Sequence, residues 1–170
     1  PLDAQLTDET GRQVELGEYF KKDKPVVLAF VYYQCPVLCP LVMNGISSAL
    51  KVVPFTAGKD FDVVLVSFDS RETHETANAK KRAHLLHWAV PETADGWHLL
   101  TGTDEQIKRV TSAAGFTYEW DEETQQFAHV SGILVVTPDG RLSRYFYGVE
   151  FSPKDLRLAL VDSGQGRVGS

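Results

Sequence analysis

The sequence contains very little sulfur. Two of its 170 residues are cysteine and one is methionine. Two cysteines cannot build the disulfide framework of a small secreted protein, and they cannot complete a zinc site of four cysteines. They can form one disulfide, one redox-active pair or part of a metal site. Both lie in one short stretch, as Cys35 and Cys39, so this stretch is the first candidate for chemistry.

Long apolar runs and clustered positive charge are also scarce. The longest apolar run, residues 25–33, is less than half of the ~20 residues that a membrane-spanning helix needs. The formal net charge is -6, whereas surfaces that bind nucleic acid carry clustered Lys and Arg. The basic cluster at residues 80–82 lies on a predicted helix, where a solvated face explains it. We therefore expect no nucleic-acid partner.

The composition otherwise fits one globular domain. With 43% hydrophobic residues, a chain of this length can bury about 70% of the surface that it would expose when unfolded. It contains no internal repeat and no linker rich enough in Pro or Gly to divide it. We predict a single domain over residues 1–170, with a core from about 6 to 162 and a flexible tail at 163–170.

Strand patterns alternate with helix patterns along the chain. Two nearly continuous apolar runs, residues 25–33 and 61–68, predict strands that are buried on both faces. The other predicted elements are hairpins at 5–16 and 132–148, a strand at 97–100, and helices at 40–53, from a start within 69–73 to about 90, at 103–114 and from 153 to about 162. This order predicts an α/β fold: a thioredoxin-like, three-layer α/β/α sandwich with a mixed central sheet and an N-terminal β-hairpin.

The two cysteines fall where a buried strand gives way to a helix. If the helix begins near Cys35, the side chains of Cys35 and Cys39 lie on one face, about 5 to 6 Å apart. The partial positive charge of a helix N-terminus favours thiolates, which are both nucleophiles and metal ligands. Burial as two small apolar side chains is the plain alternative. We favour a reactive pair, because a strand-to-helix junction is where reactive thiols are commonly placed.

The spacing of the pair leaves room for an ion. Three residues separate the cysteines in "CPVLC", whereas thioredoxin-type enzymes usually have two. A soft ion such as Cu(I) accepts two thiolates and one imidazole. The candidates for the imidazole are the five histidines, His74, His84, His87, His98 and His129.

Four of these histidines have ordinary explanations. We expect His84 and His87 to lie on the surface of a charged, half-exposed helix, His74 to be solvated at a helix start, and His98 to be a satisfied strand residue. His129 lies in a predicted loop before the penultimate strand. In a thioredoxin-like topology this loop faces the cysteines, and oxidoreductases of that fold usually have a cis-proline there. No proline lies between residues 91 and 138, so we favour His129 as the third ligand.

Together these segments resemble the Sco/SenC family of copper-binding assembly proteins, which have a thioredoxin-like fold. The cysteine motif of the family is present as "CPVLCP" at 35–40, and its distant histidine is matched by His129. "TPDG" at 137–140 and "YFYG" at 145–148 follow at the expected distances, and the resemblance spans residues 6 to about 160. Three positions differ: Gln34 replaces a common threonine, Ala128 replaces the usual aspartate before the histidine, and Val130 stands where a small hydroxyl residue is common. Loss of that carboxylate is expected to weaken copper affinity about 10- to 100-fold.

The resemblance implies a copper chaperone. Cys35, Cys39 and His129 would hold copper, as Cu(I) or Cu(II), and deliver it to the CuA site in the copper-bearing subunit of cytochrome c oxidase. Other copper chaperones or thiol reductants would be further partners. Asp69 matches an acidic residue of the family, and we expect it to act either around the metal site or as the N-cap of a helix that begins near Ser70. Family members work outside the cytoplasm, on the periplasmic side, and are tethered to the membrane by an N-terminal segment that this sequence does not include.

Two enzymatic interpretations stay open. A thiol-disulfide oxidoreductase would use Cys35 and Cys39 as its catalytic pair to reduce the cysteines of a partner, since the Cα separation within one helical turn suits a disulfide. A peroxiredoxin-like peroxidase is suggested by "YYQCPVLC", but it needs an arginine beside the nucleophile, and none lies between Arg12 and Arg71. We rank the peroxidase last.

Overall fold

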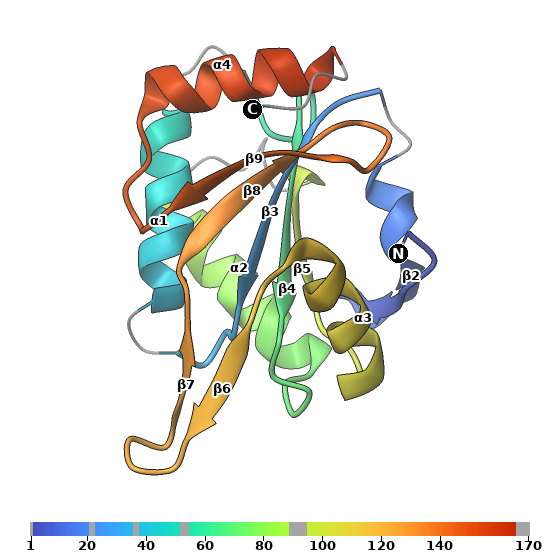
Figure 1. The fold of residues 1–170 in the computed structure, drawn as a ribbon, viewed down its shortest axis with the longest axis vertical. Helices are drawn as coiled ribbons and strands as arrows, with labels where there is room; N and C mark the ends of the chain where they lie inside the picture. Colours follow the sequence, from blue (N-terminus) through green and yellow to red (C-terminus); the bar gives the residue numbers. More distant parts are fainter. Residues whose placement is uncertain (1, 21–22, 36–37, 52–54, 89–94, 166–170) are drawn as a thin grey trace.

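The computed structural model describes residues 2–20, 23–35, 38–51, 55–88 and 95–165. At its centre is a five-stranded sheet with the strand order β5-β4-β3-β8-β9 (Figure 1). The bounds of these strands are Val26–Val31 for β3, Asp62–Ser67 for β4, Trp97–Leu100 for β5, Gly132–Val136 for β8 and Leu142–Tyr147 for β9. Strands β3, β4 and β5 are parallel, whereas β8 is antiparallel to both β3 and β9. The predicted mixed sheet is confirmed.

The two central strands are buried along their whole length. Every residue of β3 and β4 is buried, and valine is the commonest residue in both. Branched side chains fit the pleated surface of a sheet, and a strand covered on both faces reads as a continuous apolar run. The loops that follow β3 and β4 leave from the same edge of the sheet, because the two strands are parallel. Residues that follow these strands can therefore meet.

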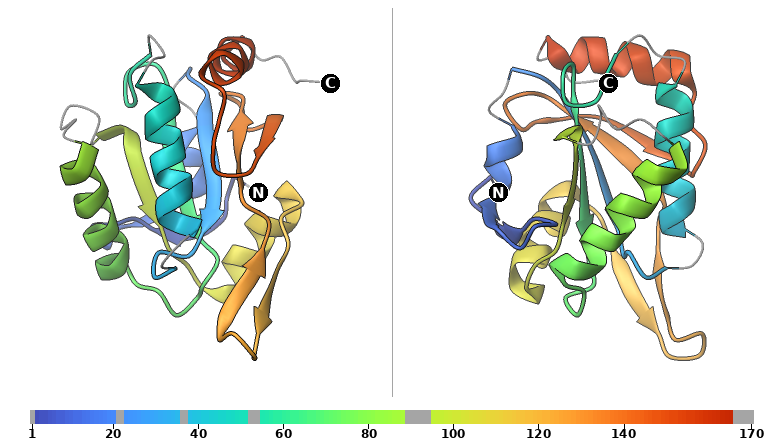
Figure 2. Two further views of the ribbon diagram at one scale, coloured as in Figure 1. Left: turned by 90° about the vertical axis from the view of Figure 1, so that its left-hand side faces the viewer. Right: turned by 180° about the vertical axis from the view of Figure 1, so that it is seen from behind.

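Four α-helices of the described ranges surround the sheet. Their bounds are Leu38–Leu50 for α1, His74–Trp88 for α2, Asp104–Ala114 for α3 and Pro153–Gly164 for α4. Helices α1 and α2 cover one face of the sheet, and α3 and the N-terminal segment lie on the other (Figures 1 and 2). Helix α4 packs against β8, β9 and α1. The three predicted layers are thus present. None of the helices in the described ranges is long and apolar enough to cross a membrane.

The predicted ends of α3 and the N-terminal hairpin are also confirmed. The side chain of Thr103 accepts a hydrogen bond from the backbone N–H of Gln106, and Gly115 ends the helix in the left-handed conformation at φ 72°. Strands β1 (Gln5–Thr7) and β2 (Gln13–Glu15) form the hairpin, and a 3-10 helix, Leu16–Tyr19, follows them.

The structure departs from the predictions at the start of α1. This helix begins at Leu38, so Cys35 lies in the turn after β3 and Cys39 lies in the first turn of the helix. The two cysteines are therefore not one helical turn apart on a regular helix, as the helix start near Cys35 would have required. Residues 52 and 53, the predicted end of this helix, lie outside the described residues, as does the end of the predicted tail, residues 166–170.

A second departure is an additional hairpin where a loop was predicted. Strands β6 (Tyr118–Asp121) and β7 (Gln126–His129) pair in antiparallel fashion and project beyond the sheet (Figures 1 and 2). His129 is thus the last residue of a strand. One face of the hairpin carries aromatic rings because Tyr118 pairs with His129 and Trp120 pairs with Phe127. The rings of Tyr118 and Phe127 lie 4.8 and 5.2 Å from that of Phe68, which follows β4, and this packing supports the short strands.

Candidate metal centre

Both cysteines have buried thiols, and both follow the C-terminal end of β3. Cys35 is 5% exposed and Cys39 is 1% exposed, and neither forms a disulfide. The backbone N–H of Cys35 donates to the carbonyl of Tyr32 at 3.1 Å, which closes the turn after β3. A tight turn thus presents one sulfur immediately before α1, and the first turn of α1 presents the other.

A buried carboxylate holds this turn in place. Glu72 accepts hydrogen bonds from the backbone N–H groups of Tyr33 and Gln34, at 2.7 and 2.8 Å, and from the hydroxyl of Ser67 at 2.5 Å. Burial raises the pKa of Glu72, and these three hydrogen bonds act in the opposite direction. The sequence patterns did not single out Glu72, which lies between β4 and α2. Its role is to fix the two residues that precede Cys35.

Asp69 acts on the hairpin and not on a helix end. Helix α2 begins at His74, so the prediction that Asp69 caps a helix beginning near Ser70 is wrong. Its carboxylate instead accepts from the backbone N–H of Arg71 at 3.0 Å and from the guanidinium of Arg71 at 2.9 Å. The Arg71 guanidinium lies over the ring of Trp120, 5.1 Å from its centroid. Asp69 therefore orients a side chain that packs on the hairpin carrying His129, and its predicted action around a metal remains a prediction.

His129 has one engaged and one unengaged ring nitrogen. Nδ1 lies 3.1 Å from the carbonyl oxygen of Val130, and because a carbonyl can only accept, Nδ1 carries the proton. Burial lowers the pKa of His129, so the ring is neutral at pH 7. Its Nε2 is buried and has no hydrogen-bond partner among the described residues. A neutral imidazole with an unshared electron pair on Nε2 is the form in which histidine binds metals.

Tyr32 connects His129 to the cysteines. Its hydroxyl is hydrogen-bonded to Cys35 and interacts with the backbone of Phe127, and its ring centroid lies 6.1 Å from that of His129. Burial, followed by the contact with Cys35, raises the pKa of Tyr32 to about 12. The phenol is therefore neutral at physiological pH. Sequence analysis did not identify Tyr32, which links the turn of the cysteines to the hairpin of the histidine.

The second cysteine has a sulfur neighbour. Cys39 Sγ lies 3.8 Å from Sδ of Met43, one turn further along α1. Burial raises the pKa of Cys39 to about 12, and the positive charge of Lys80 opposes this shift. Cys39 is therefore a protonated thiol at pH 7 in the absence of metal.

The structure does not assemble a closed set of ligands. In the described ranges, no group of three or more His, Cys, Asp or Glu side chains lies close enough together to hold a metal ion. What the structure brings together is a chain of contacts, from His129 to Tyr32 and from Tyr32 to Cys35. The ligand set Cys35, Cys39 and His129 therefore remains a prediction.

Comparison with known proteins decides the family. Residues 3–161 match the family model described as SCO1/SenC. The chain belongs to the SCO1/SenC family. The SCO1 protein homolog of Bacillus subtilis (strain 168) is 24% identical to it over 165 residues, which cover 92% of this chain and 78% of that protein.

Solved structures of similar fold include proteins with bound copper. A putative electron transfer protein of Aquifex aeolicus VF5 is 25% identical and has a TM-score of 0.85, with 98% of this chain and 92% of that chain covered. ScoI of Arabidopsis thaliana, solved with copper bound, is 20% identical, with a TM-score of 0.73 and coverage of 95% and 96%. BsSco, described as a member of the Sco family of cytochrome c oxidase assembly proteins with a disulfide switch, is 21% identical, with a TM-score of 0.67 and coverage of 95% and 91%. The fold of the SCO1/SenC chain is thus the predicted thioredoxin-like fold.

The substitution at position 128 is compensated by the backbone in this SCO1/SenC chain. Ala128 is exposed and offers no carboxylate to His129. The proton on Nδ1 is directed instead at the carbonyl of Val130. A backbone carbonyl is one of the usual groups that fix the tautomer of a ligating histidine, so the imidazole is oriented even without the aspartate.

The structure places the remaining histidines of this SCO1/SenC chain differently from the expectations in part. His84 was expected on the surface but is buried, because α2 packs this side against α1 and β5: Nε2 lies 2.8 Å from the hydroxyl of Ser47 and the ring lies 4.7 Å from that of Trp97. His98 is a strand residue, as predicted, but it was expected to be satisfied, and its buried Nε2 has no hydrogen-bond partner among the described residues and lies 3.5 Å from the carboxylate of Asp62. His74 was expected to be solvated but is half-buried, and the side chain of His87 lies outside the described part of the chain.

Proposed function

We propose that this protein is a copper chaperone, in which the thiolates of Cys35 and Cys39 and the imidazole of His129 hold one copper ion. Membership of the SCO1/SenC family supports this proposal, and so does the bound copper of the similar ScoI structure. Two thiolates and an imidazole suit a soft ion, because Cu(I) prefers sulfur and accepts low coordination numbers.

The observation that carries the proposal is the state of His129. A buried polar atom without a partner is rare and calls for an explanation. Nε2 of His129 is such an atom. The hydroxyl oxygens of Ser131 and of Tyr118, which pairs with His129 across the hairpin, are two more. The single proton of the neutral ring is on Nδ1, which donates it to the carbonyl oxygen of Val130. Nε2 can therefore only accept a hydrogen bond or bind a cation. Its position beside Tyr32, which contacts Cys35, makes copper held by the cysteines the natural cation.

The three ligands differ in what they need before they can bind copper. His129 needs no proton removed, because its pKa is lowered and it is already neutral. Cys39 must lose its proton, since its pKa is raised to about 12. Transfer to an acceptor requires ligand exchange, and the ligands nearest to solvent are His129, which is half-buried, and Cys35, which follows the exposed Gln34. We infer that Cys39 is the last protein ligand to leave the ion.

The proposed acceptor is the CuA site of cytochrome c oxidase. BsSco belongs to a family of cytochrome c oxidase assembly proteins, and we extend that role to this chain. The proposal includes an extracytoplasmic location, on the periplasmic side of a membrane to which the full-length protein is tethered. Thiol reductants and other copper chaperones would keep the cysteines reduced and supply the ion.

Copper titration of the reduced protein tests the proposal. The wild-type protein should bind one copper ion per chain with the thiols reduced and none when they are oxidised. Replacement of His129 by alanine should weaken the affinity at least about tenfold, while the circular dichroism spectrum stays unchanged. His74→Ala is the matched control, because His74 lies at the start of α2 and should leave the affinity at its wild-type value. Equal affinities of the His129→Ala variant and the wild-type protein would remove His129 from the site.

A thiol-disulfide oxidoreductase is the second candidate, and the two cysteines, which are four residues apart and free of a disulfide, favour it. Cys35 as thiolate would attack a disulfide of the partner and form a mixed disulfide, releasing one partner thiolate. Cys39 would then lose its proton, attack Cys35 and release the second partner thiol, leaving Cys35 and Cys39 oxidised. Turnover of a disulfide substrate by the metal-free protein, with loss of activity in Cys35→Ser, would support this activity. A wild-type protein without turnover in the presence of a thiol reductant would exclude it.

A further inference from the structure

Helix α1 places two sulfur atoms in contact behind the candidate metal centre. Cys39 and Met43 are four residues apart, so their side chains lie on the same side of the helix. The distance between Cys39 Sγ and Met43 Sδ is 3.8 Å, and both residues are 1% exposed. Met43 is the single methionine of the chain. Its thioether is a soft metal ligand.

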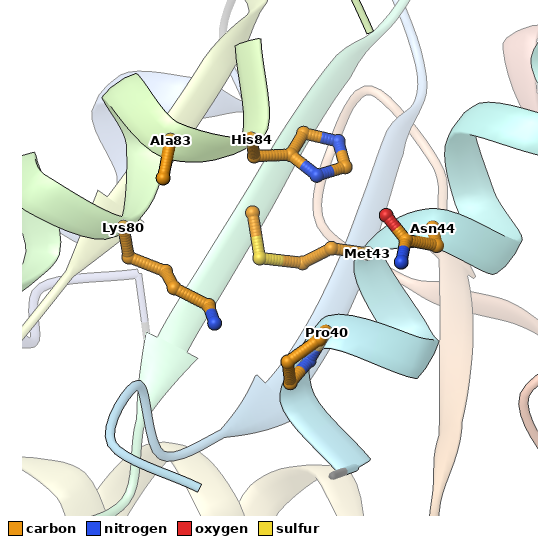
Figure 3. Close-up of a pocket in the computed structure, with 6 residues that line it drawn as sticks. All are labelled: Pro40, Met43, Asn44, Lys80, Ala83 and His84. Atoms are coloured by element: carbon orange, nitrogen blue, oxygen red, sulfur yellow. The ribbon is translucent and has the colours of Figure 1, made fainter. Parts of the chain in front are cut away.

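A pocket opens onto Met43 between α1 and α2. Its volume is about 190 Å³, and its lining residues, labelled in Figure 3, are Pro40, Met43, Asn44, Lys80, Ala83 and His84. In Figure 3 the side chain of Met43 reaches from α1 toward α2, and its sulfur lies on the side of the pocket between Lys80 and His84. The thioether therefore faces the pocket while it contacts the thiol of Cys39.

We propose that Met43 Sδ and Cys39 Sγ together form a Cu(I) subsite at the wall of this pocket. This inference rests on the proposed function, because it gives the copper ion held by Cys39 a further ligand. Met43 would bind the reduced ion more strongly than Cu(II), since thioethers are soft donors and bind Cu(II) only weakly. The chain would thus hold Cu(I) more firmly than a set of two thiolates and one imidazole alone.

The distance between the two sulfurs suits a shared ion. With both metal–sulfur bonds near the 2.3 Å that thiolate sites of zinc show, a separation of 3.8 Å corresponds to an S–metal–S angle of about 110°. This angle lies near the tetrahedral value, so neither side chain has to move far. When the ion binds, the proton of the Cys39 thiol leaves to solvent, and the oxidation state of copper does not change.

The charges around the pocket fit a thiolate that binds a monovalent ion. Lys80 lines the pocket, and its positive charge favours the thiolate of Cys39. Two thiolates, from Cys35 and Cys39, exceed the single charge of Cu(I) by one negative charge, which Lys80 can offset. His84 also lines the pocket, but its Nε2 is engaged with the hydroxyl of Ser47 at 2.8 Å. We therefore assign the metal-binding role on this side to Met43 and not to His84.

Selenium labelling offers a direct test, because one methionine means one selenium atom. Protein carrying selenomethionine at position 43 would be reduced, loaded with one equivalent of Cu(I) without oxygen, and measured by X-ray absorption at the selenium edge. We expect a copper neighbour of selenium at bonding distance, about 0.1 Å longer than a metal–sulfur bond. No amino-acid substitution is needed, so the result does not depend on the folding of a variant.

Affinities give an independent measurement. Met43→Leu conserves side-chain volume and should weaken Cu(I) binding at least about tenfold, while the Cu(II) affinity should change by much less. Asn44→Ala is the matched control, because it alters the same pocket without removing a soft ligand, and it should leave both affinities unchanged. Selenium without a copper neighbour in protein that has bound Cu(I) would overturn the Met43 ligand and leave the chaperone proposal standing. Wild-type protein that takes up no copper would overturn both.

Discussion

The role of Glu72 gives a quantitative prediction for the turn that carries Cys35. Replacement of Glu72 by alanine removes the acceptor of three hydrogen bonds, two of them from backbone N–H groups just before that cysteine. A hydrogen bond to a charged group contributes about 1.5 to 3 kcal/mol, but the burial of the carboxylate itself offsets part of the sum. We therefore expect the free energy of unfolding to fall by about 2 to 4 kcal/mol.

Urea denaturation of the metal-free, reduced protein measures this loss. With a slope near 2 kcal/mol/M, the unfolding midpoint should fall by about 1 to 2 M. Glu150→Ala removes an exposed carboxylate and should change the free energy of unfolding by less than about 0.5 kcal/mol. If Glu72→Ala unfolds at the same urea concentration as Glu150→Ala, the carboxylate does not hold the turn.

The same variant has a pH dependence with a definite sign. Burial raises the pKa of Glu72 in the folded protein above its ordinary value of 4.5. The folded protein therefore keeps a proton that the unfolded chain has already lost, so this group favours folding most below pH 4.5, and that contribution falls as the pH rises through the folded pKa. The difference in unfolding free energy between wild type and Glu72→Ala should be larger at pH 4.5 than at pH 7. An equal or smaller difference at pH 4.5 would contradict the raised pKa.

Three further predictions concern α1 and its neighbours. Cys39 is protonated below about pH 12, so copper binding should release its proton. The apparent copper affinity should therefore rise about tenfold per pH unit for each proton released, which competition titrations at several pH values measure. Ser47→Ala removes a 2.8 Å contact with His84 and should lower the unfolding free energy by about 1 kcal/mol in urea denaturation. Gly45→Ala would favour an isolated helix by about 1 kcal/mol, but its Cβ would clash with the carbonyl oxygen of Val149. Thermal unfolding should therefore show destabilisation.

Sequence patterns predicted those parts of the fold whose causes are local. The strands β3 and β4 follow from continuous apolar runs, and the ends of α3 follow from Thr103 and Gly115. The hairpin of β6 and β7 could not be predicted in this way, because each strand has four residues and an isolated short hairpin is barely stable in water. What stabilises it is the contact with Phe68, a residue about 50 positions earlier.

The same distinction holds for the candidate site. The cysteine pair is conspicuous in a sequence so poor in sulfur, and His129 was singled out through topology and family resemblance. Glu72 and Tyr32 could not be found from the sequence alone, because their roles come from contacts that join separate segments. His84 was placed on the surface for the same reason: its helix has a charged pattern, and its burial depends on α1.

The contributions of His129 and Met43 to copper binding can be measured separately, because the two residues are linked to different cysteines. His129 is connected to Cys35 through Tyr32, whereas Met43 contacts Cys39 directly. If both bind the same Cu(I) ion, each can partly compensate for the loss of the other, so the double variant should lose more affinity than the two single variants together. For Cu(II), which binds a thioether only weakly, the double variant should lose little more than His129→Ala loses. A loss from Met43→Leu that is as large for Cu(II) as for Cu(I) would show that Met43 acts through packing and not as a ligand.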